Sequence, residues 1–215
     1  MGILITLRNN NTRSYFRELL LKLINLPDTN KLVLSSGYIQ EICYRNSYSI
    51  LDDDLLLNIQ NGLVSNSNYR FVTIAGMFKN PRWQIQYNNF IHKLQINNIN
   101  VTSINIRRKN WHAKIAVKLR NNIPVAAIIG SSNLTKNAYG INFPNFNYEC
   151  DVTMWSRKRK YSKHFLKDIN FNENPFAPIY NTLSNKCKMD REEERLDAIY
   201  KSLVDPQNYE KLNTT

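Results

Sequence analysis

The sequence is poor in the residues that build disulfide frameworks and metal centres. Its 215 residues include only three cysteines, Cys43, Cys150 and Cys187, which are widely spaced and form no Cys-x-x-Cys motif. This spacing argues against a disulfide-stapled domain and against a zinc site, and it is typical of the reducing cytoplasm. We therefore expect a cytoplasmic protein without a metal or another cofactor.

Long hydrophobic runs are also missing. The longest uncharged apolar stretch near the middle of the chain, residues 123–130, is far shorter than the roughly 20 residues that a membrane-spanning helix needs. Residues 1–8 lack the basic and hydrophobic regions of a secretory signal. They formally fit a myristoylation pattern, but we interpret them as an edge strand or a cloning remnant. We expect no membrane partner.

Acidic residues are outnumbered by basic ones. The chain has 29 Lys and Arg against 17 Asp and Glu, a formal net charge of +12. This excess predicts an anionic partner, either nucleic acid or a membrane surface. With 42% hydrophobic residues the chain can bury one core, which argues against wholesale disorder.

Strand and helix patterns alternate in the first half of the chain, and strands follow one another in the second half. Helices are expected at 12–25, 51–60, 82–95 and 191–204, and strands at 31–39, 70–77, 101–107, 111–119, 125–130 and 148–155. The alternation favours a parallel sheet covered by helices. We expect a single α/β domain over residues 1–215, with a core at about 31–155, the N-terminal helix 12–25 and a basic C-terminal extension, 156–215.

Clustered carboxylates open one of these helices. Asp52, Asp53 and Asp54 are consecutive, so their side chains diverge on any regular element. We interpret them as charges at a helix N-terminus and not as a two-metal site.

Of the three histidines, His112 has the most informative neighbours. Between Trp111 and Leu119 apolar and polar residues alternate, so His112 and Lys114 share the polar face of a strand. His92 and His164 occupy positions typical of solvated or packing side chains.

Two further polar features follow. The next strand ends in Gly130-Ser131-Ser132-Asn133, where Ser131 and Asn133 have the same parity and small residues leave backbone N–H groups accessible to an anion. Glu149 comes at the start of the last core strand, where its carboxylate can accept a hydrogen bond from an imidazole N–H.

In this order, His112-x-Lys114, Gly130-Ser131-Ser132-Asn133 and Glu149 resemble the catalytic half-motif of the phospholipase D superfamily. The match is closest to its single-motif nucleases, including the metal-independent restriction-endonuclease branch, and specific residues match only between 111 and 150. The resemblance implies a mixed, largely parallel sheet with helices on both faces. The family's fuller pattern has an Asp five residues after the Lys; this chain has Leu119 there, whose parity turns it away from His112 and lets it pack.

The resemblance implies phosphodiester hydrolysis in two steps without metal. One histidine attacks phosphorus, and a second protonates the leaving oxygen and then activates water. The chain contains a single His-x-Lys unit, so a two-fold homodimer is expected, with the catalytic residues His112, Lys114, Ser131, Asn133 and Glu149 of both chains at the interface.

DNA is the expected substrate, and sequence-specific cleavage of the type II restriction kind is one form of this hypothesis. Basic residues near the motifs in the sequence are expected to contact nucleic acid: Arg107, Arg108, Lys109, Lys118, Lys136, Arg157, Lys158, Arg159 and Lys160. A phospholipase D-type lipid phosphodiesterase is the alternative, although no helix pattern combines a basic face with a spare apolar one. A DNA-binding relative without catalysis is the third hypothesis, because of Leu119.

Overall fold

The computed structural model describes most of the N-terminal three quarters of the chain and short pieces beyond it. The described residues are 2–8, 15–41, 48–64, 69–75, 80–106, 112–140, 149–167, 179–180, 200 and 209–211. Within them the strands are β1 (Gly2–Arg8), β2 (Lys31–Ser35), β3 (Arg70–Ala75), β4 (Val101–Ile106), β5 (Lys114–Arg120), β6 (Ile123–Gly130), β7 (Glu149–Trp155), β8 (Ile179–Tyr180) and β9 (Tyr209–Lys211). The helices are α1 (Tyr15–Ile24), α2 (Asp53–Val64), α3 (Pro81–Ile96), α4 (Lys136–Tyr139) and α5 (Arg159–Leu166).

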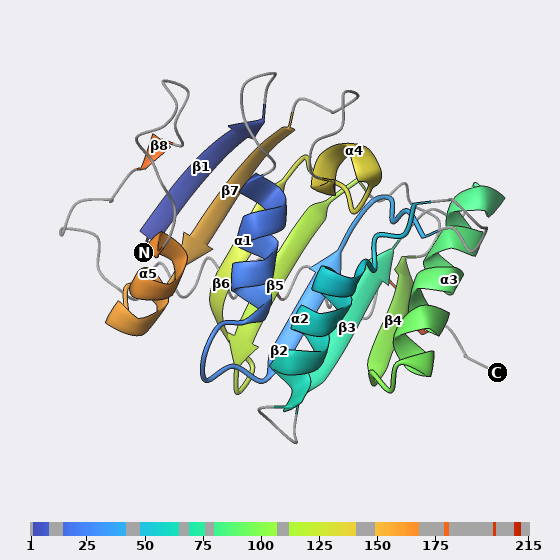
Figure 1. Cartoon of the computed structure of the whole chain (residues 1–215), viewed down its shortest axis with the longest axis horizontal. Helices are drawn as coiled ribbons and strands as arrows, with labels where there is room; N and C mark the ends of the chain where they lie inside the picture. Colours follow the sequence, from blue (N-terminus) through green and yellow to red (C-terminus); the bar gives the residue numbers. More distant parts are fainter. Residues whose placement is uncertain are drawn as a thin grey trace.

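All described strands belong to one sheet in the order β8-β1-β7-β6-β5-β2-β3-β4-β9 (Figure 1). The predicted mixed α/β sheet is confirmed, but the expectation that it is largely parallel is wrong. Only β2–β3 and β3–β4 are parallel, and the other pairings are antiparallel. Helices α2 and α3 make the two parallel crossovers, whereas two residues join β5 to β6, and the described part of the β6–β7 connection holds only the short helix α4.

The β5–β6 connection explains part of this difference. It is a two-residue turn in which Asn121 and Asn122 have φ values of 50° and 65°. Positive φ at both central residues is the geometry of a tight hairpin between antiparallel strands, and asparagine tolerates it well.

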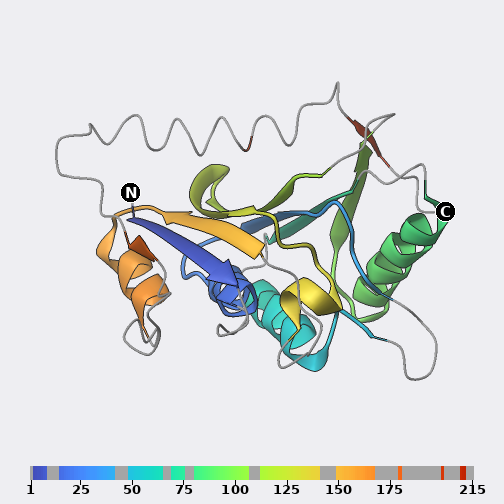
Figure 2. The same cartoon turned by 90° about the horizontal axis from the view of Figure 1, so that it is seen from above.

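The described helices lie on one face of the sheet, as Figure 2 shows, so the expectation of helices on both faces is not met within the described residues. On the helical side, α1 buries Leu19, Leu20, Leu23 and Ile24 completely. On the other face, β-strand side chains form a second apolar cluster against which Tyr200 packs. The predicted helix at 191–204 lies, apart from Tyr200, outside the described residues.

The segment after β7 differs most from expectation. Helix α5 begins inside the basic run, where no helix was predicted, because the charges hide its apolar side. Tyr161 and Phe165 are fully buried, and the Phe165 ring stacks on Trp155 with 5.1 Å between ring centroids. At the other end of the chain, β1 is not an edge strand: it lies between β7 and β8.

Candidate active site

The residues of the predicted catalytic motif meet at one edge of the sheet, the upper edge in Figure 1. Lys114 opens β5 and is the register partner of Gly130, the last residue of β6. Ser131 and Asn133 follow β6 directly, and Glu149 opens β7. Because β5, β6 and β7 are antiparallel neighbours, the start of β5, the end of β6 and the start of β7 lie at the same edge.

His112 comes two residues before β5, and its side chain is exposed. Leu119, at the other end of the same strand, is fully buried in the apolar cluster on the opposite face, together with Val117. The predicted alternation is confirmed within β5, where Leu119 packs on the face away from Lys114. The prediction that this strand begins at residue 111 and carries His112 is wrong, because β5 begins at Lys114.

Glu149 lies beneath the turn that follows β6. Its side chain is 6% exposed and accepts a hydrogen bond from the Ser131 hydroxyl. The Ser131 oxygen also accepts the Cys150 N–H at 3.0 Å. On the other side, Arg8 is the register partner of Glu149 in β1; burial lowers the pKa of Arg8, and the negative charge of Glu149 opposes that lowering. Among the described residues of one chain, Glu149 is hydrogen-bonded to Ser131 and interacts electrostatically with Arg8 and Asp151, and its expected partner His112 is not among these three.

Asn133 is held by the segment that follows β2. The Tyr38 N–H donates to its side-chain oxygen at 3.1 Å, which identifies the atom facing Tyr38 as the amide oxygen. The Ser36 hydroxyl donates to the Tyr38 carbonyl at 2.6 Å and accepts the Leu134 N–H at 3.2 Å. With its oxygen engaged, Asn133 keeps its Nδ2 donors available for an anion at this edge.

Asp151 is a buried residue of this site that the sequence analysis did not identify. It is 3% exposed and accepts the Ser132 N–H at 3.2 Å and the Ser132 hydroxyl at 2.6 Å. Burial raises the pKa of Asp151, while these two hydrogen bonds lower it and the charge of Glu149 raises it. The sequence does contain a signal for Asp151. Glu149, Asp151 and Trp155 share one parity on β7, and an aspartate at an inward-facing position needs a hydrogen-bond or ion-pair partner.

Gly130 is required by this packing. A Cβ atom at this position would lie 2.0 Å from Asp151 Oδ1 and 2.6 Å from the Cys150 carbonyl oxygen. We expect Gly130→Ala to displace Asp151 or to separate β6 from β7, at a cost of about 1–3 kcal/mol in the free energy of unfolding. Urea titration of both proteins measures this cost.

Gly62→Ala is the matched control. In α2 the nearest atom to an added Cβ is the Ile24 carbonyl oxygen at 3.3 Å, and alanine is the better helix former by roughly 1 kcal/mol. Equal stability of the two alanine variants would contradict the close packing described at Gly130.

The basic residues expected around the site are distributed differently in space. Arg107, Arg108 and Lys109 lie outside the described residues. Lys136 begins α4, where its backbone N–H donates to Gln40 Oε1 at 2.9 Å, so it remains close to the turn.

The run Arg157, Lys158, Arg159 and Lys160 follows the far end of β7. Trp155, at that end, is the register partner of Ala126 near the start of β6, so the run lies at the edge opposite Glu149. Lys160 is paired there with Asp28. These four residues therefore do not lie beside the motif residues, and their contact with nucleic acid stays a prediction.

Lys118 does not reach the surface, so its assignment as a nucleic-acid contact is wrong. It is 1% exposed, and its ammonium group donates to the Ile24 carbonyl at the end of α1 at 2.5 Å and lies 4.7 Å from the centre of the Tyr69 ring. Burial lowers the pKa of Lys118 to about 7. The same parity that brings Lys114 to the edge of the sheet points Lys118 into the core under α1.

This buried amine gives the protein a specific pH dependence. Between about pH 7 and the unperturbed value of 10.5, the unfolded state binds the proton that the folded state has lost, so stability rises with pH in this window. Lys118→Met removes that dependence. We expect the free energy of unfolding of the variant, relative to that of the wild type, to fall by up to about 1.4 kcal/mol per pH unit as the pH increases from 7 towards 10. Urea unfolding of both proteins at several pH values measures it; a difference independent of pH would show that Lys118 stays charged.

The clustered carboxylates have the structural role that the sequence predicts. Asp52 Oδ1 accepts the Leu55 N–H at 2.9 Å, as a helix cap does. Arg17 forms ion pairs with both carboxylates: its Nη1 lies 2.6 Å from Asp52 Oδ2, and its Nη2 lies 2.7 Å from Asp54 Oδ2.

No group of three or more His, Cys, Asp or Glu side chains in the described ranges is arranged to hold a metal ion. In the same part of the chain, no helix combines the length and the apolar character needed to cross a bilayer.

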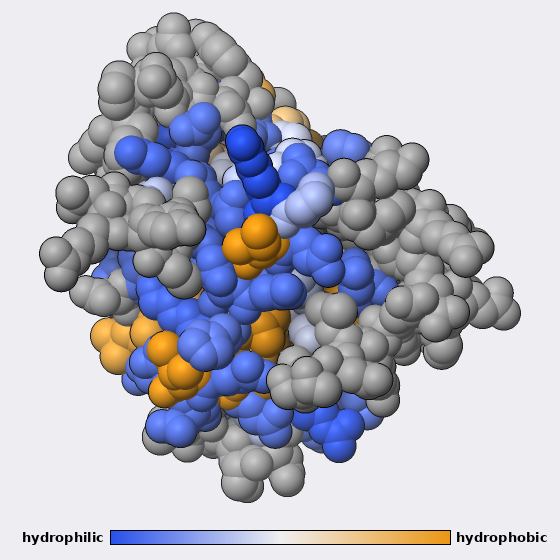
Figure 3. Space-filling view, turned by 90° about the vertical axis from the view of Figure 1, so that its right-hand side faces the viewer, coloured by the Kyte–Doolittle hydropathy of each residue, from blue (hydrophilic) through white to orange (hydrophobic). Residues whose placement is uncertain are grey.

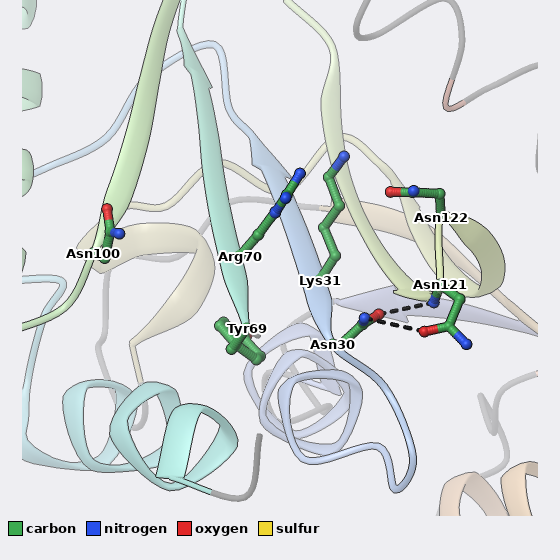
Figure 4. A pocket seen from close by; sticks show the side chains of 7 residues that line it. All are labelled: Asn30, Lys31, Tyr69, Arg70, Asn100, Asn121 and Asn122. Atoms are coloured by element: carbon green, nitrogen blue, oxygen red, sulfur yellow. Dashed lines mark hydrogen bonds between the residues drawn. The ribbon is translucent and has the colours of Figure 1, made fainter. Parts of the chain in front are cut away.

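A cavity of about 470 Å³ opens at the edge of the sheet opposite the motif residues. Figure 4 shows Lys31 and Arg70 extending side by side along its wall and Asn30 bonded to Asn121 of the β5–β6 turn. Asn121 follows the last residue of β5, whereas Lys114 is the first, so the length of β5 separates the cavity from the site. Arg70 is exposed and is therefore a useful control position far from the site.

Comparison with known proteins supports the fold. No family model and no curated protein matches the sequence. Phosphatidylserine synthase from Haemophilus influenzae Rd KW20 superposes with a TM-score of 0.51 at 12% identity, covering 97% of this chain and 45% of the synthase. NucT from Helicobacter pylori covers 75% of this chain and 95% of its own length at 14% identity and a TM-score of 0.44. Polyphosphate kinase from Porphyromonas gingivalis covers 74% and 24% at 13% identity and a TM-score of 0.48.

This chain thus spans less than half of the synthase and about a quarter of the kinase. At such identities the likeness to the synthase concerns the fold alone. The likeness to the synthase agrees with the mixed α/β sheet expected from the sequence.

Proposed function

We propose that this chain is a phosphodiesterase that hydrolyses DNA at the edge of the sheet where its motif residues meet. The supporting observation is that Ser131, Asn133 and Glu149 lie at the ends of neighbouring strands, with Lys114 beside them and the exposed His112 two residues earlier. Ammonium, amide and backbone N–H groups are donors suited to phosphoryl oxygens. An imidazole serves as nucleophile and as acid or base near neutral pH.

The proposed reaction has two steps. In the first, His112 attacks phosphorus, a P–N bond forms, and the P–O ester bond breaks while a second imidazole protonates the leaving oxygen. In the second, that imidazole removes a proton from water as the water attacks phosphorus and the P–N bond breaks. The products are one hydroxyl end, one phosphate end and the free histidine. Neither step calls for an ion or a cofactor, so cleavage is expected to continue in EDTA.

The second imidazole is proposed to come from another copy of the chain. His92 is exposed on α3, and His164 contacts the Lys22 carbonyl on the side of the sheet where α5 lies. Neither has a lysine two residues later. A two-fold homodimer supplies a second His112, with one composite site at the interface.

DNA is favoured over lipid by the surface and the charge. The exposed large hydrophobic side chains of the described chain are dispersed over four elements: Leu7, Leu57, Ile85, Ile96 and Ile123. Figure 3, which views the side where α3 lies, shows a mainly hydrophilic surface with isolated apolar groups. A lipid phosphodiesterase needs a contiguous apolar surface at the membrane, whereas a net charge of +12 suits a polyanion.

Digestion of a defined plasmid in EDTA tests this proposal. Wild-type protein is expected to cleave it, and Arg70→Gln, which removes one charge at the opposite edge, is expected to cleave it equally well. Sequencing of the ends distinguishes discrete sites, as for a restriction endonuclease, from general cleavage. Release of headgroups from phosphatidylcholine vesicles without DNA cleavage would overturn the proposal in favour of a lipid phosphodiesterase. DNA retardation without cleavage would indicate an inactive binding relative.

A further inference from the structure

We propose that the stacked rings of Tyr38 and Trp83 bind an unpaired base of the substrate, so that the enzyme cleaves single-stranded DNA faster than it cleaves duplex DNA. This inference rests on the proposed function and specifies its substrate. The two rings form an aromatic pair at the same edge of the sheet as the motif residues, one from the segment after β2 and one from the first turn of α3.

Contacts with neighbouring residues hold the two rings against each other. The ring centroids are 4.7 Å apart at an interplanar angle of 28°, and both side chains are only half-buried. The Gln86 amide, one turn further along α3, donates to the Tyr38 hydroxyl at 2.7 Å. Asn80 caps the helix and Pro81 begins it, which fixes the backbone next to Trp83. A rigid, partly exposed aromatic stack costs little entropy when a third flat ring extends it.

The backbone of Tyr38 connects the aromatic pair with the candidate site. Tyr38 carries the N–H that holds the Asn133 side-chain oxygen at 3.1 Å. The residues after Tyr38 run beside the turn after β6: Gln40 N–H donates to the Leu134 carbonyl at 2.8 Å, and Ile39 and Leu134 form a parallel bridge. A nucleotide whose phosphate lies at Asn133 therefore has its base, or the next one, within reach of the rings.

The surroundings suit a nucleic acid strand. Arg82 is exposed beside Trp83, where its guanidinium can meet a phosphate or the face of a base. The exposed apolar residues of α3, Ile85 and Ile96, lie further along the helix and are 59% and 64% exposed. Bases in a duplex are stacked on their neighbours and offer no free face, so an aromatic platform selects unpaired bases.

Binding measurements in a His112→Ala background test the inference without turnover. Each variant, without a label, is titrated into fluorescently labelled (dT)16. We expect Trp83→Leu to bind this oligomer about tenfold to a hundredfold more weakly than Trp83→Phe, which keeps an aromatic ring. With an abasic oligomer of the same length the two variants are expected to bind equally. Ile85→Ala, an exposed change on the same helix, is expected to bind as the parent does. Equal binding of (dT)16 by the leucine and phenylalanine variants would overturn the inference.

Tryptophan fluorescence gives a second readout that does not depend on the leucine variant folding. In a Trp111→Phe, His112→Ala protein the remaining tryptophans are Trp83 and the fully buried Trp155. Addition of (dT)16 is expected to quench the Trp83 emission, and unchanged emission at saturation would overturn the inference. Failure of the wild type to cleave any DNA would refute the proposed function itself. Cleavage of single strands and duplexes with equal efficiency by both wild type and Trp83→Leu would refute only the stacking role.

Discussion

Replacing His112 by alanine is expected to reduce DNA cleavage by at least about a thousandfold. The substitution removes the nucleophile and, in a homodimer, the acid–base group as well, and each positioned acid–base group typically contributes on the order of 10²- to 10⁴-fold. The exposed position of His112 before β5 means that the loss is not caused by unfolding. Single-turnover cleavage of a labelled oligonucleotide in EDTA measures the effect.

His92→Ala is the matched control for this experiment. His92 is also exposed, but it lies on α3 and has no lysine two residues later. We expect His92→Ala to cleave as the wild type does and to unfold at the same denaturant concentration as His112→Ala. Cleavage by His112→Ala within tenfold of the wild-type rate would assign the chemistry to another group.

Mixed dimers carrying one His112→Ala chain are expected to lose at least about a hundredfold in cleavage rate. A composite site needs one imidazole as nucleophile and the other as acid and base, so a single substitution disables the only site in the dimer. Two independent sites would instead leave half of the wild-type activity. Co-expression of two differently tagged chains and tandem affinity purification provide the mixed dimer, and a mixed dimer with one His92→Ala chain is its control.

Half-activity of the His112 mixed dimer would contradict the shared site. So would a monomer with full activity, observed by sedimentation at the concentration of the assay. Both outcomes would leave the phosphodiesterase proposal in place but would require the second imidazole to come from the same chain.

The local elements could be predicted from the sequence because periodicity is a local property. The helix α3 at Pro81–Ile96 was expected at 82–95, and the strand β6 at Ile123–Gly130 was expected at 125–130. The parity of β5 also correctly predicted that Leu119 is buried on the face away from Lys114. Strand direction depends on distant partners, and for this reason the alternating pattern led to an overestimate of the parallel pairings.

Proximity in the sequence did not predict which basic residues lie near the motif in the folded chain. Arg157 and its neighbours follow Glu149 closely in the sequence, but the seven residues of β7 carry the chain across the sheet, roughly 20 Å at the rise of a strand. Lys118 is only four residues from Lys114, yet it points into the core below the end of α1. In both cases the contacting partner, Asp28 or Ile24, belongs to a part of the chain that no local pattern connects with the motif.

The supporting residues of the site were missed for the same reason. Asp151 holds the turn after β6 through Ser132, and Tyr38 holds Asn133, but neither contact is encoded in a short motif. The motif itself names the groups that would face a phosphate. The residues that keep these groups in place come from β7 and from the segment that follows β2, and only the folded sheet brings them together.

Trapping of the covalent intermediate tests the central claim most directly. Wild-type protein is mixed with excess single-stranded oligonucleotide in EDTA and quenched at alkaline pH, because a P–N bond to histidine is labile in acid, and the digest is examined by mass spectrometry. The account predicts a peptide in which His112 carries the oligonucleotide phosphate, and no such adduct in His112→Ala. Cleavage of the DNA without an adduct on His112, or with an adduct on another residue, would contradict it.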